Sequence, residues 1–524
     1  MPRRDVSDLW IVAGLLLLAL AGFVLAWTAT QRFGPGMSPD ALIYLCGAKN
    51  VAAGKGFIMP DGQPIVIWAP LFAHAIAAVN SVGLDLLTSA RLVNSAAFSL
   101  LILSCGLWIR RTVAFRPFTI PGAASILLAK PLIYSASFVW SEVPFLLLMV
   151  LFLIEVGNSI RRPTIARLIV TGVLGAMMFL TRYAGYPIVA AGGLALLTMS
   201  STSLKKRLRD VLIFAVACGA VVAPWLVRNY ILSHTITGER HPSQVTLVQN
   251  AVSALTTMVS WQLPSTLPLG LRRAIFVMIA AVIAWAVVRA LRKRGSEQHE
   301  STAPAVAAIA LLIFVPLLVV SASKFATDFL QDRLLSPAYV LMVLLGVATL
   351  DRAVSAFSAG TARRVALVLA TAGFCVWLLF PLHTAYLVWS QYRLSGPGRY
   401  LKSAWTDSAF ARRVNHLPAR SVLISNSPEA VFITTSRSAV VSTHTSRIAV
   451  YEGLPPGVLK FAELIRTGEP HYLIWYNDDG YRTYLHTTGD LSSVARFRVM
   501  YRSRSGAIYH VSAIPPEEQR AVTN

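Results

Sequence analysis

The sequence predicts a polytopic α-helical membrane protein that carries a small α/β domain at its C-terminus. Of its 524 residues, 55% are hydrophobic and only 14% are charged, whereas soluble chains carry about a quarter charged residues. Apolar runs of roughly 18 residues or more, long enough to cross a hydrocarbon layer of about 30 Å, recur through residues 1–390. The last 135 residues contain no such run. We therefore expect a transmembrane domain over 1–390 and a soluble domain over 391–524.

The net charge of +23 is distributed as in a membrane protein. Basic residues form short clusters that alternate with loops poorer in Lys and Arg. The clusters are Arg3 and Arg4; Arg110, Arg111 and Arg116; Arg161, Arg162 and Arg167; Lys205, Lys206, Arg207 and Arg209; Arg289, Arg292, Lys293 and Arg294; and Arg352, Arg363 and Arg364. This alternation is the positive-inside pattern. It predicts a cytoplasmic N-terminus and argues against a nucleic-acid partner.

The apolar runs predict eleven transmembrane helices. They lie near 9–29, 87–109, 117–135, 139–157, 167–182, 184–200, 210–231, 273–291, 303–321, 334–350 and 365–389. No clear small-residue cleavage site follows the first run, so we expect a retained helix rather than a cleaved signal peptide. Eleven crossings place every basic cluster in the cytoplasm and the tail on the non-cytoplasmic side of a plasma (inner) membrane.

The tail has the pattern of a partly parallel sheet covered by helices. Short apolar segments over Ser421–Asn426, Ser438–Ser442 and Tyr472–Tyr476 predict strands, and Val458–Arg466 has helical spacing. Residues 496–511 predict a terminal hairpin, with its turn at 503–506.

The first outer loop, residues 30–86, contains two predicted interfacial helices. Ser38 is a suitable N-cap and Pro39 suits the first helical position, so a helix should run to about Ala53 and stop at Gly54. A second, amphipathic helix should begin near Pro70. Asp40 then lies in the first turn of a helix, where the helix dipole favours an acid for structural reasons alone.

Several short motifs share one side of the membrane in this topology. In the first outer loop, Pro-Asp at 39–40 is followed by a nearby Tyr, by G-x-G-F and by P-L-F. The others are Ser141-Glu142, Thr181-Arg182, Arg228-Asn229-Tyr230 and Asp332-Arg333-Leu334-Leu335-Ser336-Pro337. In order and sidedness this set resembles the membrane glycosyltransferases that use polyprenyl-phosphate sugars. This C-type superfamily includes the protein O-mannosyltransferases (glycosyltransferase family 39) and the aminoarabinose transferases.

The resemblance covers about residues 1–390 and implies a catalytic role for Asp40. Many members carry two adjacent acids in the first loop, but here Ala41 follows Asp40. This departure weakens any inference of a metal that needs a second carboxylate, although the reaction is compatible with a divalent metal. No cofactor is called for by the sequence, because it lacks a P-loop, a G-x-G-x-x-G motif and metal-ligand spacings of His or Cys.

Glu142 and several cations on the outer side are the next candidates. Glu142 is either a first-turn acid or a group that orients substrate, and a carboxylate between apolar runs is costly. The cations either snorkel towards lipid headgroups or hold the donor phosphate, whose charge grows as it leaves. These cations are Arg182, Arg333, Lys130, Arg228 and Lys55.

Tyr44, Trp68 and His74 are candidates for contact with the sugar or the acceptor. The alternative for Tyr44 and Trp68 is that they are aromatic residues of the membrane–water interface. The resemblance implies an inverting hexosyl- or pentosyltransferase at the non-cytoplasmic face, whose partners are membrane lipids, a polyprenyl-phosphate sugar and an acceptor glycan, lipid or protein. Two alternatives remain open. One is a transporter or flippase of a lipid-linked or anionic substrate, and the other is a non-catalytic subunit whose outer domain binds a partner.

Overall fold

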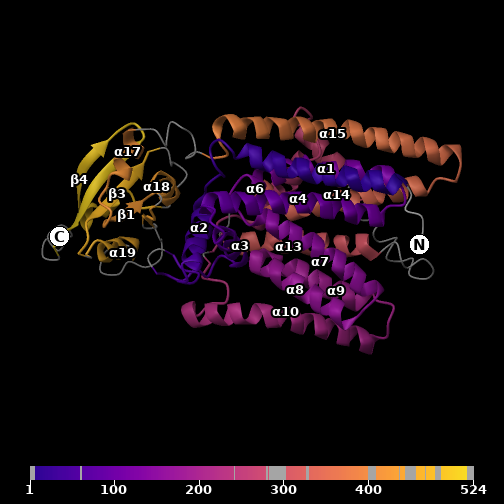
Figure 1. Cartoon of the computed structure of the whole chain (residues 1–524), viewed down its shortest axis with the longest axis horizontal. Helices are drawn as coiled ribbons and strands as arrows, with labels where there is room; N and C mark the ends of the chain where they lie inside the picture. The colour runs from indigo at the N-terminus through magenta and orange to yellow at the C-terminus, as the bar shows by residue number, and fades with distance from the viewer. Residues whose placement is uncertain are drawn as a thin grey trace.

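The computed structural model describes residues 6–59, 62–240, 242–278, 281, 302–325, 330–398, 409–435, 437–442, 456–466, 468–477 and 485–515. Long helices form a bundle, and a small sheet domain lies at one end of it (Figure 1). Helices α2 (Pro39–Ala52) and α3 (Leu71–Asn80) lie between the bundle and the sheet. The bundle helices are α1 (Val6–Ala29), α4 (Leu86–Thr112), α5 (Thr119–Leu127), α6 (Lys130–Ala136), α7 (Glu142–Arg161), α8 (Ile165–Thr181), α9 (Tyr186–Met199), α10 (Leu204–Ser233), α13 (Thr302–Lys324), α14 (Asp332–Ser355) and α15 (Thr361–Ser395).

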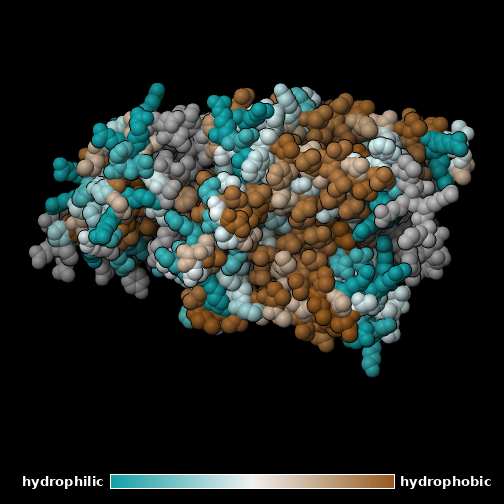
Figure 2. Space-filling model, in the orientation of Figure 1, coloured by the Kyte–Doolittle hydropathy of each residue, from teal (hydrophilic) through white to brown (hydrophobic). Residues whose placement is uncertain are grey.

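Seven of the described helices are long and apolar enough to cross a membrane, and an eighth crossing forms if the bent pair α5–α6 counts as one. Helices α8 and α9 are apolar but shorter, and they coincide with two further predicted spans. Most of the predicted span 273–291 lies outside the described residues. The part of it that is described, 273–278 and 281, is helical. A hydrophobic band covers the bundle and ends in hydrophilic surface on both sides (Figure 2). The predicted polytopic helical fold is confirmed, and the assignment of its cytoplasmic side stays a prediction.

The third span differs from the prediction of one straight helix. The chain breaks between α5 and α6 and bends by 51°. Ala129 is extended, with φ −68° and ψ 109°, and Pro131 follows at the start of α6. Proline has no N–H to donate to the carbonyl four residues earlier, so a continuous helix would lose a hydrogen bond here. The break leaves Lys130 at the beginning of the new helix.

The first outer loop folds as predicted. Ser38 caps α2 (Pro39–Ala52) by accepting a hydrogen bond from the Ala41 N–H at 3.3 Å, and α3 covers Leu71–Asn80. Both helices bury apolar side chains in a shared cluster that includes Leu45, Phe72 and Ile76. Because α2 packs against α3 through this cluster, the first turn of α2 is held in place.

The tail forms a five-stranded sheet of order β2-β1-β3-β5-β4. The strands are β1 (Val422–Ser425), β2 (Val440–Val441), β3 (His471–Tyr476), β4 (Ala495–Arg502) and β5 (Gly506–Ala513). Strand β1 pairs in parallel with β2 and β3, whereas β5 pairs antiparallel with β3 and β4. Helices α17 (Ala409–Asn415) and α18 (Pro428–Thr435) pack on one face, and α19 (Pro456–Leu464) packs on the other. This is the predicted partly parallel sheet covered by helices.

The tail domain is docked on the first outer loop. Helix α18 contacts α2, and Phe432 of α18 is 6% exposed within the cluster formed by α2 and α3. The helix that carries Asp40 therefore packs against both the bundle and the tail.

Candidate active site

A chain of ion pairs joins four of the predicted site residues. Glu142 Oε1 accepts hydrogen bonds from Arg182 Nη1, at 2.6 Å, and from Arg333 Nε. Arg333 Nη2 donates to Asp40 Oδ2. Trp68 Nε1 donates to the other oxygen, Asp40 Oδ1, at 3.1 Å. Residues that are up to 293 positions apart in the sequence thus form one network.

The segment that precedes α7 brings the two acids together. The Gly36 N–H donates to Ser137 O at 2.7 Å, and the Val139 N–H donates to Gly36 O at 3.0 Å. Trp140 Nε1 donates to the capping hydroxyl of Ser38 at 2.7 Å. The start of α2, with Asp40, is thereby aligned with the start of α7, with Glu142.

Glu142 is buried, with 2% of its side chain exposed. A buried carboxylate is expensive unless cations and hydrogen bonds compensate for the lost hydration, and Arg182 and Arg333 supply that compensation. Its second oxygen, Oε2, has no hydrogen-bond partner among the described residues. Glu142 contacts both arginines and is not among the residues that line the pocket described below, so it holds the arginines from behind.

Tyr44 joins the network through Ser141. The two hydroxyl oxygens are 2.9 Å apart, and Arg182 Nη1 donates to the same serine at 3.2 Å. Burial raises the pKa of Tyr44 to about 12, so its phenol stays neutral at physiological pH. Tyr44 therefore keeps its hydroxyl proton and can donate a hydrogen bond.

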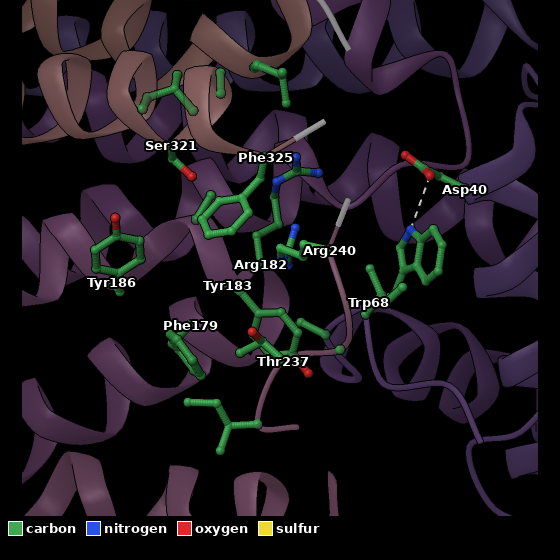
Figure 3. A pocket seen from close by; sticks show the side chains of 18 of the residues that line it. Asp40, Trp68, Phe179, Arg182, Tyr183, Tyr186, Thr237, Arg240, Ser321 and Phe325 are labelled. Carbon is green, nitrogen blue, oxygen red and sulfur yellow. Dashed lines mark hydrogen bonds between the residues drawn. The ribbon is translucent and has the colours of Figure 1, made fainter. Parts of the chain in front are cut away.

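A pocket of about 750 Å³ opens beside the network. Its charged lining residues are Asp40, Arg182, Arg240 and Arg333, and its apolar lining includes Phe179, Leu226, Leu318, Phe325 and Leu334. In Figure 3, Asp40 and Trp68 lie on one side, Phe179 and Tyr186 lie on the other, and Arg182 and Arg240 lie between them. The pocket therefore runs from a carboxylate, past cations, to an apolar end.

Two predicted phosphate ligands have other contacts. Arg228 donates to the carbonyls of Ile65 and Phe57 in the first outer loop, at 2.9 and 2.8 Å, and its guanidinium lies over the Trp225 ring. Lys130 Nζ pairs with Asp332 Oδ2 at 3.3 Å. Neither residue lines the pocket, so a role of either in binding phosphate stays a prediction.

Lys55 and His74 also lie away from the pocket. Lys55 is exposed between two glycines with positive φ, Gly54 at 71° and Gly56 at 87°. His74 Nδ1 is 2.8 Å from Pro70 O within its own helix turn. Tyr44 and Trp68, by contrast, both line the pocket.

Three contributors have no distinguishing pattern in the sequence. Trp140 lies 4.3 Å from the Arg333 guanidinium in a cation–π contact. Tyr183 lines the pocket and donates to Val66 O at 3.0 Å. Arg240 lies in the segment that follows α10. Within the described ranges, no group of three His, Cys, Asp or Glu side chains could hold a metal ion.

Comparison with known proteins gave matches only in structure. No family model matches, and a search of curated sequences found no relative. ArnT from Cupriavidus metallidurans in the apo state is 12% identical with a TM-score of 0.62, and the match covers 97% of this chain and 98% of ArnT. The resemblance predicted from the sequence is confirmed at the level of the fold.

The same fold recurs in other solved structures. ArnT bound to undecaprenyl phosphate matches with a TM-score of 0.60 and 14% identity, over 95% of this chain and 98% of ArnT. The archaeal oligosaccharyltransferase AglB from Archaeoglobus fulgidus, in complex with an inhibitory peptide and a dolichol-phosphate, matches with a TM-score of 0.58 and 12% identity. That match covers 98% of this chain and 75% of AglB. The likeness includes the tail as well as the bundle.

Proposed function

We propose that the chain is an inverting glycosyltransferase that moves a sugar from a polyprenyl-phosphate donor to an acceptor hydroxyl at the non-cytoplasmic face of the membrane. The observation that carries this proposal is the order of groups along the pocket. A carboxylate, then arginines, then apolar side chains match an acceptor hydroxyl, a donor phosphate and a lipid chain. Two of the structural neighbours hold undecaprenyl phosphate or dolichol-phosphate, which agrees with a donor of this class.

The position of Asp40 supports its proposed role as the general base. Its side chain is 24% exposed, and it lines the pocket. A carboxylate offers about four acceptor positions, so the contacts with Trp68 and Arg333 leave capacity on both oxygens. In the proposed reaction, Asp40 removes the proton of the acceptor hydroxyl while the oxygen of that hydroxyl attacks the anomeric carbon of the donor sugar.

The arginines would stabilise the leaving group. As the bond between the anomeric carbon and the phosphate oxygen breaks, its electron pair passes to the phosphate, and the configuration at the anomeric carbon inverts. Arg182 and Arg333 both line the pocket and are held by Glu142. Fixed cations that need no rearrangement stabilise developing charge most effectively.

The decisive experiment tests Asp40 in the full chain purified in detergent. The protein is incubated with a panel of polyprenyl-phosphate sugars and acceptor membranes, and the release of polyprenyl phosphate is measured. Asp40→Asn should lower the transfer rate by about 10²–10⁴-fold, the usual contribution of a general base. Full transfer by this variant would remove Asp40 from that role.

Asp85→Asn is the matched control. Asp85 belongs to the same loop and caps α4 by accepting from the N–H groups of Leu87 and Thr88, both at 3.0 Å. Asn caps helices as well as Asp, so this variant should keep the wild-type rate. If the wild type transfers no sugar from any donor but moves polyprenyl-phosphate sugars across vesicles, the protein is a transporter instead.

A further inference from the structure

The network of acids and arginines carries no net charge. Asp40 and Glu142 contribute two negative charges, and Arg182 and Arg333 contribute two positive charges. The ion pairs already occupy part of each guanidinium. A neutral cluster of this kind attracts an anion only weakly, although a polyprenyl-phosphate sugar is anionic. Further positive charge is therefore needed at the pocket.

Arg240 supplies that charge. It is the fourth charged residue of the described pocket lining, beside Asp40, Arg182 and Arg333. No described residue forms a hydrogen bond or ion pair with its guanidinium, and its side chain is exposed. An arginine without a partner keeps its donors for a ligand and offers the planar fork that suits phosphate.

The backbone around Arg240 is held on both sides. Before it, Asn229 Nδ2 donates to Ile236 O at 3.0 Å. After it, the Ser243 N–H donates to Lys324 O at 3.1 Å. Gly238, at φ +86°, lies so close to Ile67 that an added Cβ would be 2.3 Å from its side chain. The segment thus crosses the first outer loop at a fixed place.

We propose that Arg240 binds the phosphate of the lipid-linked donor and gives the pocket, together with the ion-pair network beside it, a net positive charge. The inference rests on the proposed function and assigns a phosphate ligand within that site. Arg240 lies with Arg182 between the Asp40 side and the apolar side of the pocket (Figure 3). A phosphate there would have the lipid chain on one side and the reacting sugar on the other.

The test measures binding of undecaprenyl phosphate and of the uncharged polyprenol to the full chain in detergent. Arg240→Gln should weaken the binding of undecaprenyl phosphate by about tenfold, because a hydrogen bond to a charged group contributes at least about 1.4 kcal/mol. Polyprenol binding should not change. Arg240→Lys should lie between the wild type and the glutamine variant. The difference between wild type and Arg240→Gln should shrink at high ionic strength.

Arg393→Gln is the matched control, because Arg393 lies near the end of α15, over the Trp389 ring, and does not line the pocket. Equal binding of undecaprenyl phosphate by wild type and Arg240→Gln would refute the role of Arg240 alone. No binding by the wild type would refute the proposed function as well. Displacement of the lipid by equimolar phosphatidylglycerol or inorganic phosphate would show a general anion site and also overturn the assignment.

Discussion

Glu142→Gln tests whether the buried carboxylate holds the two arginines in place. Glu142 Oε1 accepts from Arg182 and Arg333, and only 2% of its side chain is exposed, so solvent screening is slight. Removal of one partner from a buried ion pair costs about 3–5 kcal/mol. Glutamine keeps a neutral carbonyl acceptor in the same place. We therefore expect a loss of about 2–3 kcal/mol in the free energy of unfolding.

The assay is denaturant unfolding of the full chain in detergent, followed by tryptophan fluorescence. Glu155→Gln is the matched control, since Glu155 lies on the same helix and accepts a hydrogen bond from Asn158 at 2.9 Å. At that half-buried position the same substitution should cost less than about 0.5 kcal/mol.

The result also separates two roles for Glu142. A positioning residue should lose stability and affinity for undecaprenyl phosphate together, because both arginines lose their anchor. A residue that exchanges a proton with substrate should lose turnover by about 10²-fold or more while its stability is kept. If Glu142→Gln costs no more stability than Glu155→Gln, the interpretation of a buried ion-pair anchor is wrong.

Three further predictions concern the surroundings of the site. Phe432→Ala should cost about 3–5 kcal/mol and speed limited proteolysis of the tail, whereas the same change at the exposed Phe357 should do neither. Gly238→Ala should weaken undecaprenyl phosphate binding, because its positive φ and the nearby Ile67 force the segment of Arg240 to shift; unchanged binding would contradict this. Burial raises the pKa of Tyr44 to about 12, so the phenol ionises more easily in the unfolded state than in the folded state. Its contribution to the free energy of unfolding is therefore fully present below pH 10 and is lost as the pH rises through 12. Tyr44→Phe should therefore flatten the pH dependence of the unfolding midpoint between pH 10 and 12, and an unaltered profile would argue against a buried, neutral phenol.

Much of the fold could be predicted because its signals are local. Long apolar runs indicate the spans, and the Ser38-Pro39 pair correctly placed the start of α2. The bend between α5 and α6 was missed, because the hydropathy of the run is continuous across the break. Its cause is Pro131, whose missing N–H acts on the backbone and leaves mean hydropathy unchanged.

The site was predicted less completely than the fold. Asp40 stood out through the resemblance to the membrane glycosyltransferases, and Arg182 and Arg333 stood out as cations on the predicted outer side; the structure brings the three together. Trp140 and Arg240 did not stand out, because an aromatic residue at a helix start and a cation in a loop are both common. Their importance comes from contacts across the fold, with Arg333 for the tryptophan and with the pocket for the arginine.

The first two residues of α14 face different neighbours. Arg333 binds Asp40 and Glu142, whereas Asp332 binds Lys130 and the Trp261 indole N–H, the latter at 2.6 Å. Each residue of a helix is rotated by about 100° from the one before it. Insertion or deletion of one residue in the first turns of α14 would therefore turn both side chains away from their partners. Related chains should vary freely in loop length but keep the spacing between this pair and the rest of the helix.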